Sequence, residues 1–245
     1  MTAGVDFEPA DPAEVARFHT RHQAVLEQIA AAAGRSGRDP AAVRLVAVSK
    51  TVPAERLRAA LVAGLRVLGE NRVQEGEAKR PLVPGATWEL IGPLQSNKAH
   101  RAIATYDVIQ SVDSIDLATR LDRIVEALGR RAVRLPVLLQ VNVDADPAKA
   151  GFAPGQLEEG LATLLDLAHL RVDGLMTVGR FVDEAEAARP TFRRLRELGD
   201  RLRSIDGRLG PALSMGMSAD FEVAIEEGAT IVRVGRAIFG ERPVP

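Results

Sequence analysis

The 245-residue chain has a formal net charge of −1, 46% hydrophobic residues and no cysteine. This length and hydrophobic content suffice for a substantial core, built as one α/β barrel or as two smaller domains. A near-neutral charge gives no general attraction to nucleic acid or an anionic membrane, and the lack of cysteine excludes disulfides, thiolate catalysis and cysteine-ligated metals. With no basic and apolar leader and no long apolar run, we expect a cytoplasmic protein that binds neither nucleic acid nor membrane.

In chain order, we expect residues 1–10 to be frayed or disordered and residues 11–245 to form one domain. That domain begins with a helix from about Asp11 to Ala33. Short apolar or β-branched runs then recur, and they suit strands buried in a sheet. There are eight of them, at residues 44–50, 66–73, 87–93, 107–114, 136–143, 170–179, 211–218 and 230–240.

The segments between these runs carry helix boundary signals. Pro53 and Gly64 flank one segment, and Ser114 and Gly129 flank another, as a start and a stop respectively. Strands that alternate with helices form βαβ units with a parallel sheet. Eight such units in this length predict a single (β/α)8 TIM-type barrel with an extra N-terminal helix.

Active sites in such barrels lie at the carboxyl ends of the strands. The ends of the eight runs carry many polar side chains, which we expect to converge on one mouth. They are Lys50, Glu70, Asn71, Gln95 to Lys98, Ser111 to Ser114, Asn142, Met176, Thr177, Ser214 to Ser218 and Arg233 to Arg236.

Lysine is rare in this chain, because four lysines stand among the 32 basic residues. A lysine can lose its proton and form a Schiff base, whereas an arginine cannot. Lys50 ends the first apolar run beside the next helix, and apolar walls and the positive helix end both disfavour its charged form. The alternative is a lysine that marks a strand end at the surface.

The other three lysines have simpler interpretations. Lys79 lies in the polar run "EGEAKR", and no chemical role is expected for it. Lys98 is expected on an exposed helix after the third strand, with anion binding as the alternative. Lys149 is expected in a solvated loop after the fifth strand, with covering of the site as the alternative.

The last two runs predict a phosphate site, which in such barrels lies after strands 7 and 8. Gly216 lets backbone N–H groups approach an anion, and Ser218 is expected to open a helix whose N-terminus favours negative charge. Ser214 supplies a second hydroxyl. At the end of the last strand, Gly235 and Arg236 are also placed to hold an anion. Taken alone, Ser218 is equally a helix cap and Gly235 a packing glycine. Together with Lys50, they predict a phosphorylated aldehyde held as an imine.

Several motifs resemble the YggS/PROSC family of pyridoxal 5′-phosphate (PLP) homeostasis proteins, in order from about residue 11 to the C-terminus. They are "AVSKT", "GENRVQE", "WELIGPLQSNK", "VNVDADPAKAGF", "GLMTVG" and "LSMGMSADFEVAIEEGATIVRVGRAIFG". The resemblance implies a PLP-binding barrel of the alanine-racemase type. It also implies Lys50 as the imine lysine, Asn71 near the cofactor, Arg233 at the pyridine nitrogen, and Ser214, Gly216, Ser218, Gly235 and Arg236 near the phosphate.

The chain departs from the family pattern at three positions. The family often has histidine where this chain has Glu89 and Pro93, and often has threonine where this chain has Arg236. The departures at Glu89 and Pro93 bear on any role of the third strand. The departure at Arg236 bears on the details of phosphate contact.

A racemase needs an acid and a base on the two faces of its substrate, and related racemases take one from a tyrosine in an additional domain. We expect no such domain here, because the chain ends shortly after Phe239, and we expect its one tyrosine, Tyr106, to pack. Arg233 would also leave the pyridine nitrogen unprotonated. The histidines His19, His22, His100 and His169 lack metal-ligand spacing, so no metal is expected.

The sequence therefore predicts a non-catalytic, monomeric PLP-binding protein that stores, buffers or delivers PLP, possible recipients being apo PLP-dependent enzymes. A weakly active PLP-dependent racemase-like enzyme is the first alternative. A class I aldolase-like barrel that uses Lys50 on a sugar phosphate without PLP is the second.

Overall fold

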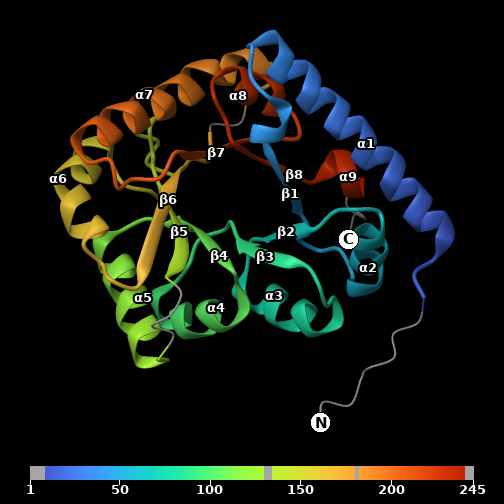
Figure 1. Cartoon of the computed structure of the whole chain (residues 1–245), viewed down its shortest axis with the longest axis horizontal. Helices are drawn as coiled ribbons and strands as arrows, with labels where there is room; N and C mark the ends of the chain where they lie inside the picture. Colours follow the sequence, from blue (N-terminus) through green and yellow to red (C-terminus); the bar gives the residue numbers. More distant parts are fainter. Residues whose placement is uncertain (1–8, 130–133, 180–181, 241–245) are drawn as a thin grey trace.

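The computed structural model describes residues 9–129, 134–179 and 182–240, and within them eight parallel strands close into a barrel in the order β1 to β8 (Figure 1). The predicted (β/α)8 fold is confirmed. The prediction for the first ten residues falls mostly on residues 1–8, outside the described part. The strands are β1 (Arg44–Val48), β2 (Val67–Glu70), β3 (Thr87–Leu90), β4 (Val108–Val112), β5 (Leu135–Gln140), β6 (Leu170–Met176), β7 (Ala212–Met217) and β8 (Ile231–Val234).

Helices surround the barrel, and their ends follow local sequence signals. The Ser114 side chain accepts a hydrogen bond from the backbone N–H of Leu117 at the predicted cap, and Gly64 and Gly129 take the positive φ typical of helix stops. The helices are α1 (Pro12–Arg35), α2 (Ala54–Val62), α3 (Val73–Lys79), α4 (Ala99–Thr105), α5 (Ile115–Ala127), α6 (Pro154–Leu165), α7 (Arg189–Ile205), α8 (Phe221–Glu226) and α9 (Arg236–Phe239). Four 3-10 turns accompany them: η1 (Pro40–Ala42), η2 (Arg80–Leu82), η3 (Ser96–Lys98) and η4 (Ala185–Ala188).

The extra helix α1 covers the side of the barrel where the first and last strands meet. It contacts α2, α8 and α9 (Figure 1), and the Phe18 ring packs edge-on against Phe239 with 5.5 Å between ring centroids. The Asp11 side chain caps its first turn by accepting from the N–H of Ala13. The beginning and end of the described chain are thus packed together.

The strands separate two apolar layers. Alternation along β1 directs Val46 into the barrel and Ala47 toward the helices, where the larger core lies. The apolar part of the interior is small: it comprises Val46, Ile91, Leu138, Met176 and Ile231. The rest of the interior has room for polar side chains.

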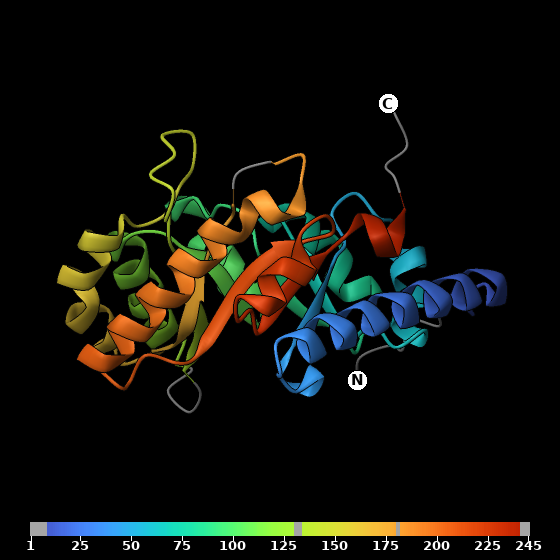
Figure 2. The same ribbon diagram turned by 90° about the horizontal axis from the view of Figure 1, so that it is seen from above.

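All strands are parallel, so their carboxyl ends lie on one side of the barrel. Figure 2 shows the segments that follow β5 and β6, together with α9, rising on that side. None of the described helices is both long and apolar enough to cross a membrane.

Candidate functional site

Lys50 lies at the mouth between the first and last strands. It follows β1 by two residues and is half-buried. Ala47 pairs with Val234, so the chain beyond β1 runs beside the chain beyond β8. A methyl group added to Gly235 would lie 3.3 Å from Cβ of Val48. Closure of the barrel therefore brings Lys50 close to the segment that carries Gly235 and Arg236.

Arg233 is a buried cation on the adjacent strand, where it pairs with Val46. Its Nη1 donates to Oγ of Ser214 at 2.7 Å, and its Nη2 donates to the carbonyl oxygen of Thr177 at 2.7 Å. Burial lowers the pKa of Arg233 to about 10, against the opposing effect of Asp220. The guanidinium stays charged at neutral pH and is held from two sides.

Ser214 lies inside the barrel. Its side chain is fully buried, and its hydroxyl donates to Oε1 of Gln110 at 2.6 Å. Because β4 and β7 are not neighbours in the barrel, this bond crosses the interior. A hydroxyl has one proton, so Ser214 has no donor left for a phosphate oxygen in this arrangement. The structure groups Ser214 with Arg233, apart from the other residues predicted at the phosphate.

Ser218 does not open a helix, and that prediction is wrong. Helix α8 begins at Phe221, because Asp220 closes a turn first: the N–H of Met217 donates to Oδ1 of Asp220 at 2.6 Å. The Ser218 hydroxyl instead accepts from the N–H of Gly235 at 3.1 Å. This bond ties the segment after β7 to the segment after β8.

Gly216 is required by close packing. It has φ +90°, and a methyl group there would lie 2.6 Å from Cβ of Ala224 on α8. Arg236 is exposed at the start of α9. Gly216 at the end of β7, Ser218 just after it, Gly235 after β8 and Arg236 at the start of α9 therefore lie on two joined segments beside Lys50.

The sequence-based interpretation missed Lys79, for which it expected no chemical role. Its side chain is 12% exposed, and its Nζ donates to the carbonyl oxygen of Ser49 at 2.9 Å and to Oε1 of Glu70 at 2.7 Å. Helix α3 packs on β2, so its last residue reaches the strand ends. The one available signal was the retention of lysine in a chain that otherwise uses arginine.

The cluster of Lys79, Glu70, Ser49 and Glu75 holds both peptide neighbours of Lys50. Ser49 also donates its hydroxyl to Glu70 at 2.7 Å, and the N–H of Thr51, which has φ +66°, donates to Oε2 of Glu75 at 3.1 Å. Burial raises the pKa of Glu70, and the hydrogen bonds from Lys79 and Ser49 oppose that rise. The cluster fixes the backbone on either side of Lys50.

Three other residues from the sequence analysis have clear positions. Tyr106 is buried, and its hydroxyl donates to the carbonyl oxygen of Arg72 at 2.9 Å, so the prediction that it packs is confirmed. Lys149 is not simply solvated, because its Nζ donates to the carbonyl oxygens of Val178 and Gly179. Lys98 ends η3, where α4 begins.

Asn71 and Asn142 both follow the ends of strands. Asn71 is half-buried after β2, and a methyl group on Gly92 would lie 2.2 Å from its carbonyl oxygen. Asn142 exchanges hydrogen bonds with the backbone of Asp146, at 2.8 and 3.0 Å, within the segment after β5. Asn142 therefore shapes its own loop.

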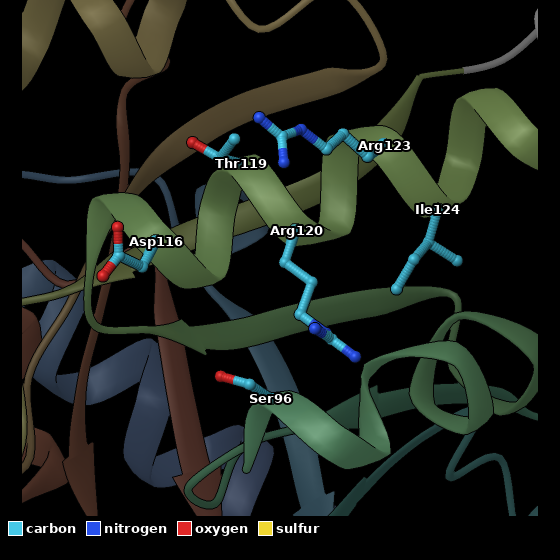
Figure 3. Close-up of a pocket in the computed structure, with 6 residues that line it drawn as sticks. All are labelled: Ser96, Asp116, Thr119, Arg120, Arg123 and Ile124. Atoms are coloured by element: carbon cyan, nitrogen blue, oxygen red, sulfur yellow. The ribbon is translucent and has the colours of Figure 1, made fainter.

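Two cavities lie against helix α5 and involve none of the residues proposed to bind a ligand. Figure 3 shows the first, with Arg120 extending toward the segment that bears Ser96. It has a volume of about 570 Å³, and the second, of about 480 Å³, shares Asp116 with it. Across the described residues, no group of three or more acidic or histidine side chains is placed to hold a metal ion.

Comparisons with known proteins show the family of this chain. Residues 21–243 match the family model "Alanine racemase, N-terminal domain". The pyridoxal phosphate homeostasis proteins of Aquifex aeolicus and Escherichia coli K12 are 43% and 40% identical to this chain over 220 and 230 residues. Each alignment covers 89% of this chain, and 95% and 94% of the two relatives. The chain belongs to the pyridoxal phosphate homeostasis family.

Solved structures with a similar fold include a close relative and more distant enzymes. PipY of Synechococcus elongatus PCC7942, solved without PLP and with PLP bound, is 40% and 39% identical, with TM-scores of 0.81 and 0.79. Each comparison covers 91% of this chain and 100% of PipY. An alanine racemase of Clostridium difficile 630 shares the fold at 16% identity and a TM-score of 0.71, over 95% of this chain and 61% of the racemase.

Proposed function

We propose that this protein binds PLP at the mouth between β1 and β8 and stores, buffers or delivers it without turning over a substrate. One observation carries the proposal: Lys50 lies beside the joined loops of Ser218 and Gly235, just after the strand that pairs with the strand of the buried Arg233. An amine, an anion-binding loop pair and a fixed cation thus meet at one place. The related PipY has been solved with PLP bound.

The donor set fits PLP. PLP supplies an aldehyde that reacts with a lysine amine, together with a phosphate and a pyridine ring. Lys50 would hold the aldehyde carbon as an imine, and Gly216, Ser218, Gly235 and Arg236 would bind the phosphate. Arg233 would face the pyridine nitrogen, with Ser214 supporting it from below, and Asn71 would line the ring.

The same residues favour a carrier over a racemase. A guanidinium that stays charged at neutral pH keeps the facing nitrogen unprotonated, which weakens the ring as an electron sink. Tyr106 is buried under α3 with its proton committed to Arg72, and burial raises its pKa further from neutrality. The curated relatives are named for PLP homeostasis.

We infer that apo PLP-dependent enzymes receive the cofactor, and that the working form is a cytoplasmic monomer. An imine exchanges between amines without an oxidant or reductant, so an apo enzyme with its own lysine can accept PLP. A restored apo enzyme, with this protein as the only PLP source, would support delivery. A dimer detected by light scattering would contradict the proposed monomeric state.

The absorption spectrum of the purified protein tests the site. We expect a yellow protein, and borohydride reduction should attach the PLP mass to the peptide that contains Lys50. Lys50→Arg should lose the colour, whereas Lys98→Arg, the matched control, should keep it. A PLP adduct on Lys79, Lys98 or Lys149 would show that a lysine other than Lys50 holds the cofactor. A colourless protein that forms a reducible adduct with a sugar phosphate would favour the aldolase alternative.

A further inference from the structure

A continuous row of hydrogen-bonded polar side chains crosses the barrel interior from Arg44 to Arg233. Arg44 and Gln110 both donate to Glu89, Gln110 in turn accepts from the Ser214 hydroxyl at 2.6 Å, and Ser214 accepts from Arg233 at 2.7 Å. Glu89, Gln110, Ser214 and Arg233 are at most 4% exposed. The row begins at the first residue of β1 and ends at the residue proposed to face the PLP ring.

Every proton in this row points toward Glu89. A carboxylate only accepts hydrogen bonds, so Gln110 must present its amide N–H group to Glu89 and its carbonyl oxygen to Ser214. Ser214 must then donate to Gln110, which leaves its oxygen lone pair for Arg233. The direction of all the bonds is therefore fixed from both ends, because the Glu89 carboxylate only accepts and the Arg233 guanidinium only donates. Bonds aligned in this way polarise and strengthen one another.

We propose that Glu89 is a positioning residue, which acts through Gln110 and Ser214 to hold the Arg233 guanidinium toward the ring nitrogen of PLP. A neutral residue that can both donate and accept at position 89 would permit either orientation of the Gln110 amide. With the amide reversed, Ser214 would have to accept from both Gln110 and Arg233 while its own proton lost its acceptor. The bond between Ser214 and Arg233, one of the two that fix Arg233, would then weaken.

Arg44 allows a carboxylate to stay in this interior. The Glu89 side chain has no exposed surface, and a buried charge needs a partner. Arg44 supplies the opposite charge from the start of β1, with 40% of its side chain exposed. The family often has histidine at this position, whereas this chain has Glu89, which forms an ion pair with Arg44.

The inference rests on the proposed role of Arg233, so its test starts with the protein free of PLP. NMR of 15N-labelled protein measures the hydrogen exchange of the Arg233 guanidinium. We expect Glu89→Gln, Gln110→Met and Ser214→Ala each to speed this exchange about tenfold, since each removes a link that fixes a charge-assisted bond. Leu138→Met is the control, because Leu138 is buried in the same interior without belonging to the row, and its exchange rate should match the wild type.

The second measurement uses PLP labelled with 15N in the ring. In the wild type the ring nitrogen should stay unprotonated to lower pH than in the three variants, in which the pH of proton uptake should rise by about one unit, a tenfold change in the equilibrium. Unchanged Arg233 exchange in all three folded variants would overturn the positioning role, whatever PLP does. If Arg233 exchanges faster in the variants but the pH of ring-nitrogen protonation is the same in all of them, the row of hydrogen bonds is supported. The placement of PLP against Arg233 is then refuted.

Discussion

At the scale of single residues, arginine and lysine have different roles in this chain. Arg233 presents a planar fork to two acceptors at the barrel mouth. Lys79 puts a compact ammonium between a backbone carbonyl and a buried carboxylate, an arrangement that the planar guanidinium of an arginine does not reproduce. Each position therefore needs its own residue type.

Replacement of Lys79 by Met should destabilise the protein by about 3–5 kcal/mol, because it leaves Glu70 buried without its cation. Lys79→Arg should recover only part of this loss, since the guanidinium cannot take the ammonium position. Urea denaturation at neutral pH measures both effects. The double variant Lys79→Met with Glu70→Gln should be more stable than Lys79→Met alone, and a double variant that is less stable would contradict the buried-charge explanation.

Ser218 and Ser214 should respond differently when each is replaced by Ala. Ser218→Ala should weaken the binding of PLP more than that of pyridoxal, by about 1.5–3 kcal/mol for one charge-assisted hydrogen bond to phosphate. Ser214→Ala should weaken both ligands alike, because its hydroxyl supports Arg233. Spectroscopic titration with the two ligands distinguishes these patterns, and a phosphate-selective loss in Ser214→Ala would return Ser214 to the phosphate site.

At the scale of elements, ion pairs bind the short helix α8 to its neighbours. Arg189, at the start of α7, donates to Glu226 at 2.6 Å and to Glu227 at 3.2 Å, and Arg35 at the end of α1 also reaches Glu226. Helix α8 has only six residues and would not form alone. Because it packs on Gly216, these contacts also support the loop beside Lys50.

Arg189→Met should lower stability by about 1 kcal/mol at pH 7, as expected for the loss of three partly exposed pairs, with Glu186, Glu226 and Glu227. Hydrogen bonds from Arg189 and Arg35 lower the pKa of Glu226 from 4.5, so this stabilisation is present above pH 4.5 and is lost as pH falls through the folded-state pKa. The difference in melting temperature from wild type should shrink in acid. Arg193→Met, which removes one 3.4 Å contact to Glu227, is the matched control with a smaller effect; a difference that is constant with pH would refute the ionic origin.

At the scale of the whole molecule, barrel closure creates the site. Lys50 comes from the first strand end, while Arg233 and Gly235 come from the last, and they meet because β1 pairs with β8. The barrel interior holds the Arg233 guanidinium in place, while Tyr106 lies in the core between the strands and the helices and donates its proton to Arg72. We therefore expect this barrel to retain a cofactor rather than to abstract a proton.

The protein should catalyse no α-proton exchange above that of free PLP when incubated with L- or D-alanine in deuterated water. The unprotonated ring nitrogen spreads negative charge poorly, so the α-proton leaves slowly. Tyr106→Phe should leave this background unchanged, although it removes the hydrogen bond to Arg72. NMR of the α-proton is the measurement, and rapid stereoselective exchange that Tyr106→Phe abolishes would favour the racemase.

The sequence by itself determined the barrel and the position of Lys50. Alternating short apolar runs and local stop signals such as Gly64 and Gly129 depend on neighbours only a few residues away, so the pattern is visible in the chain. The motif at residues 213–240 likewise predicted that the loops after β7 and β8 share one site, and the Ser218–Gly235 bond joins them.

Only the tertiary structure decided which polar residues act together. Lys79 reaches the backbone 30 positions away, and Ser214 meets Gln110 across 104 positions, distances at which no periodic pattern operates. The local sequence also gave a wrong prediction at Ser218, because the turn that Asp220 closes moves the start of the helix to Phe221. The assignment of Ser214 to Arg233, and the link from Glu89 to the mouth, exist because opposite walls of a closed barrel face each other, a relation that arises only when β8 pairs with β1.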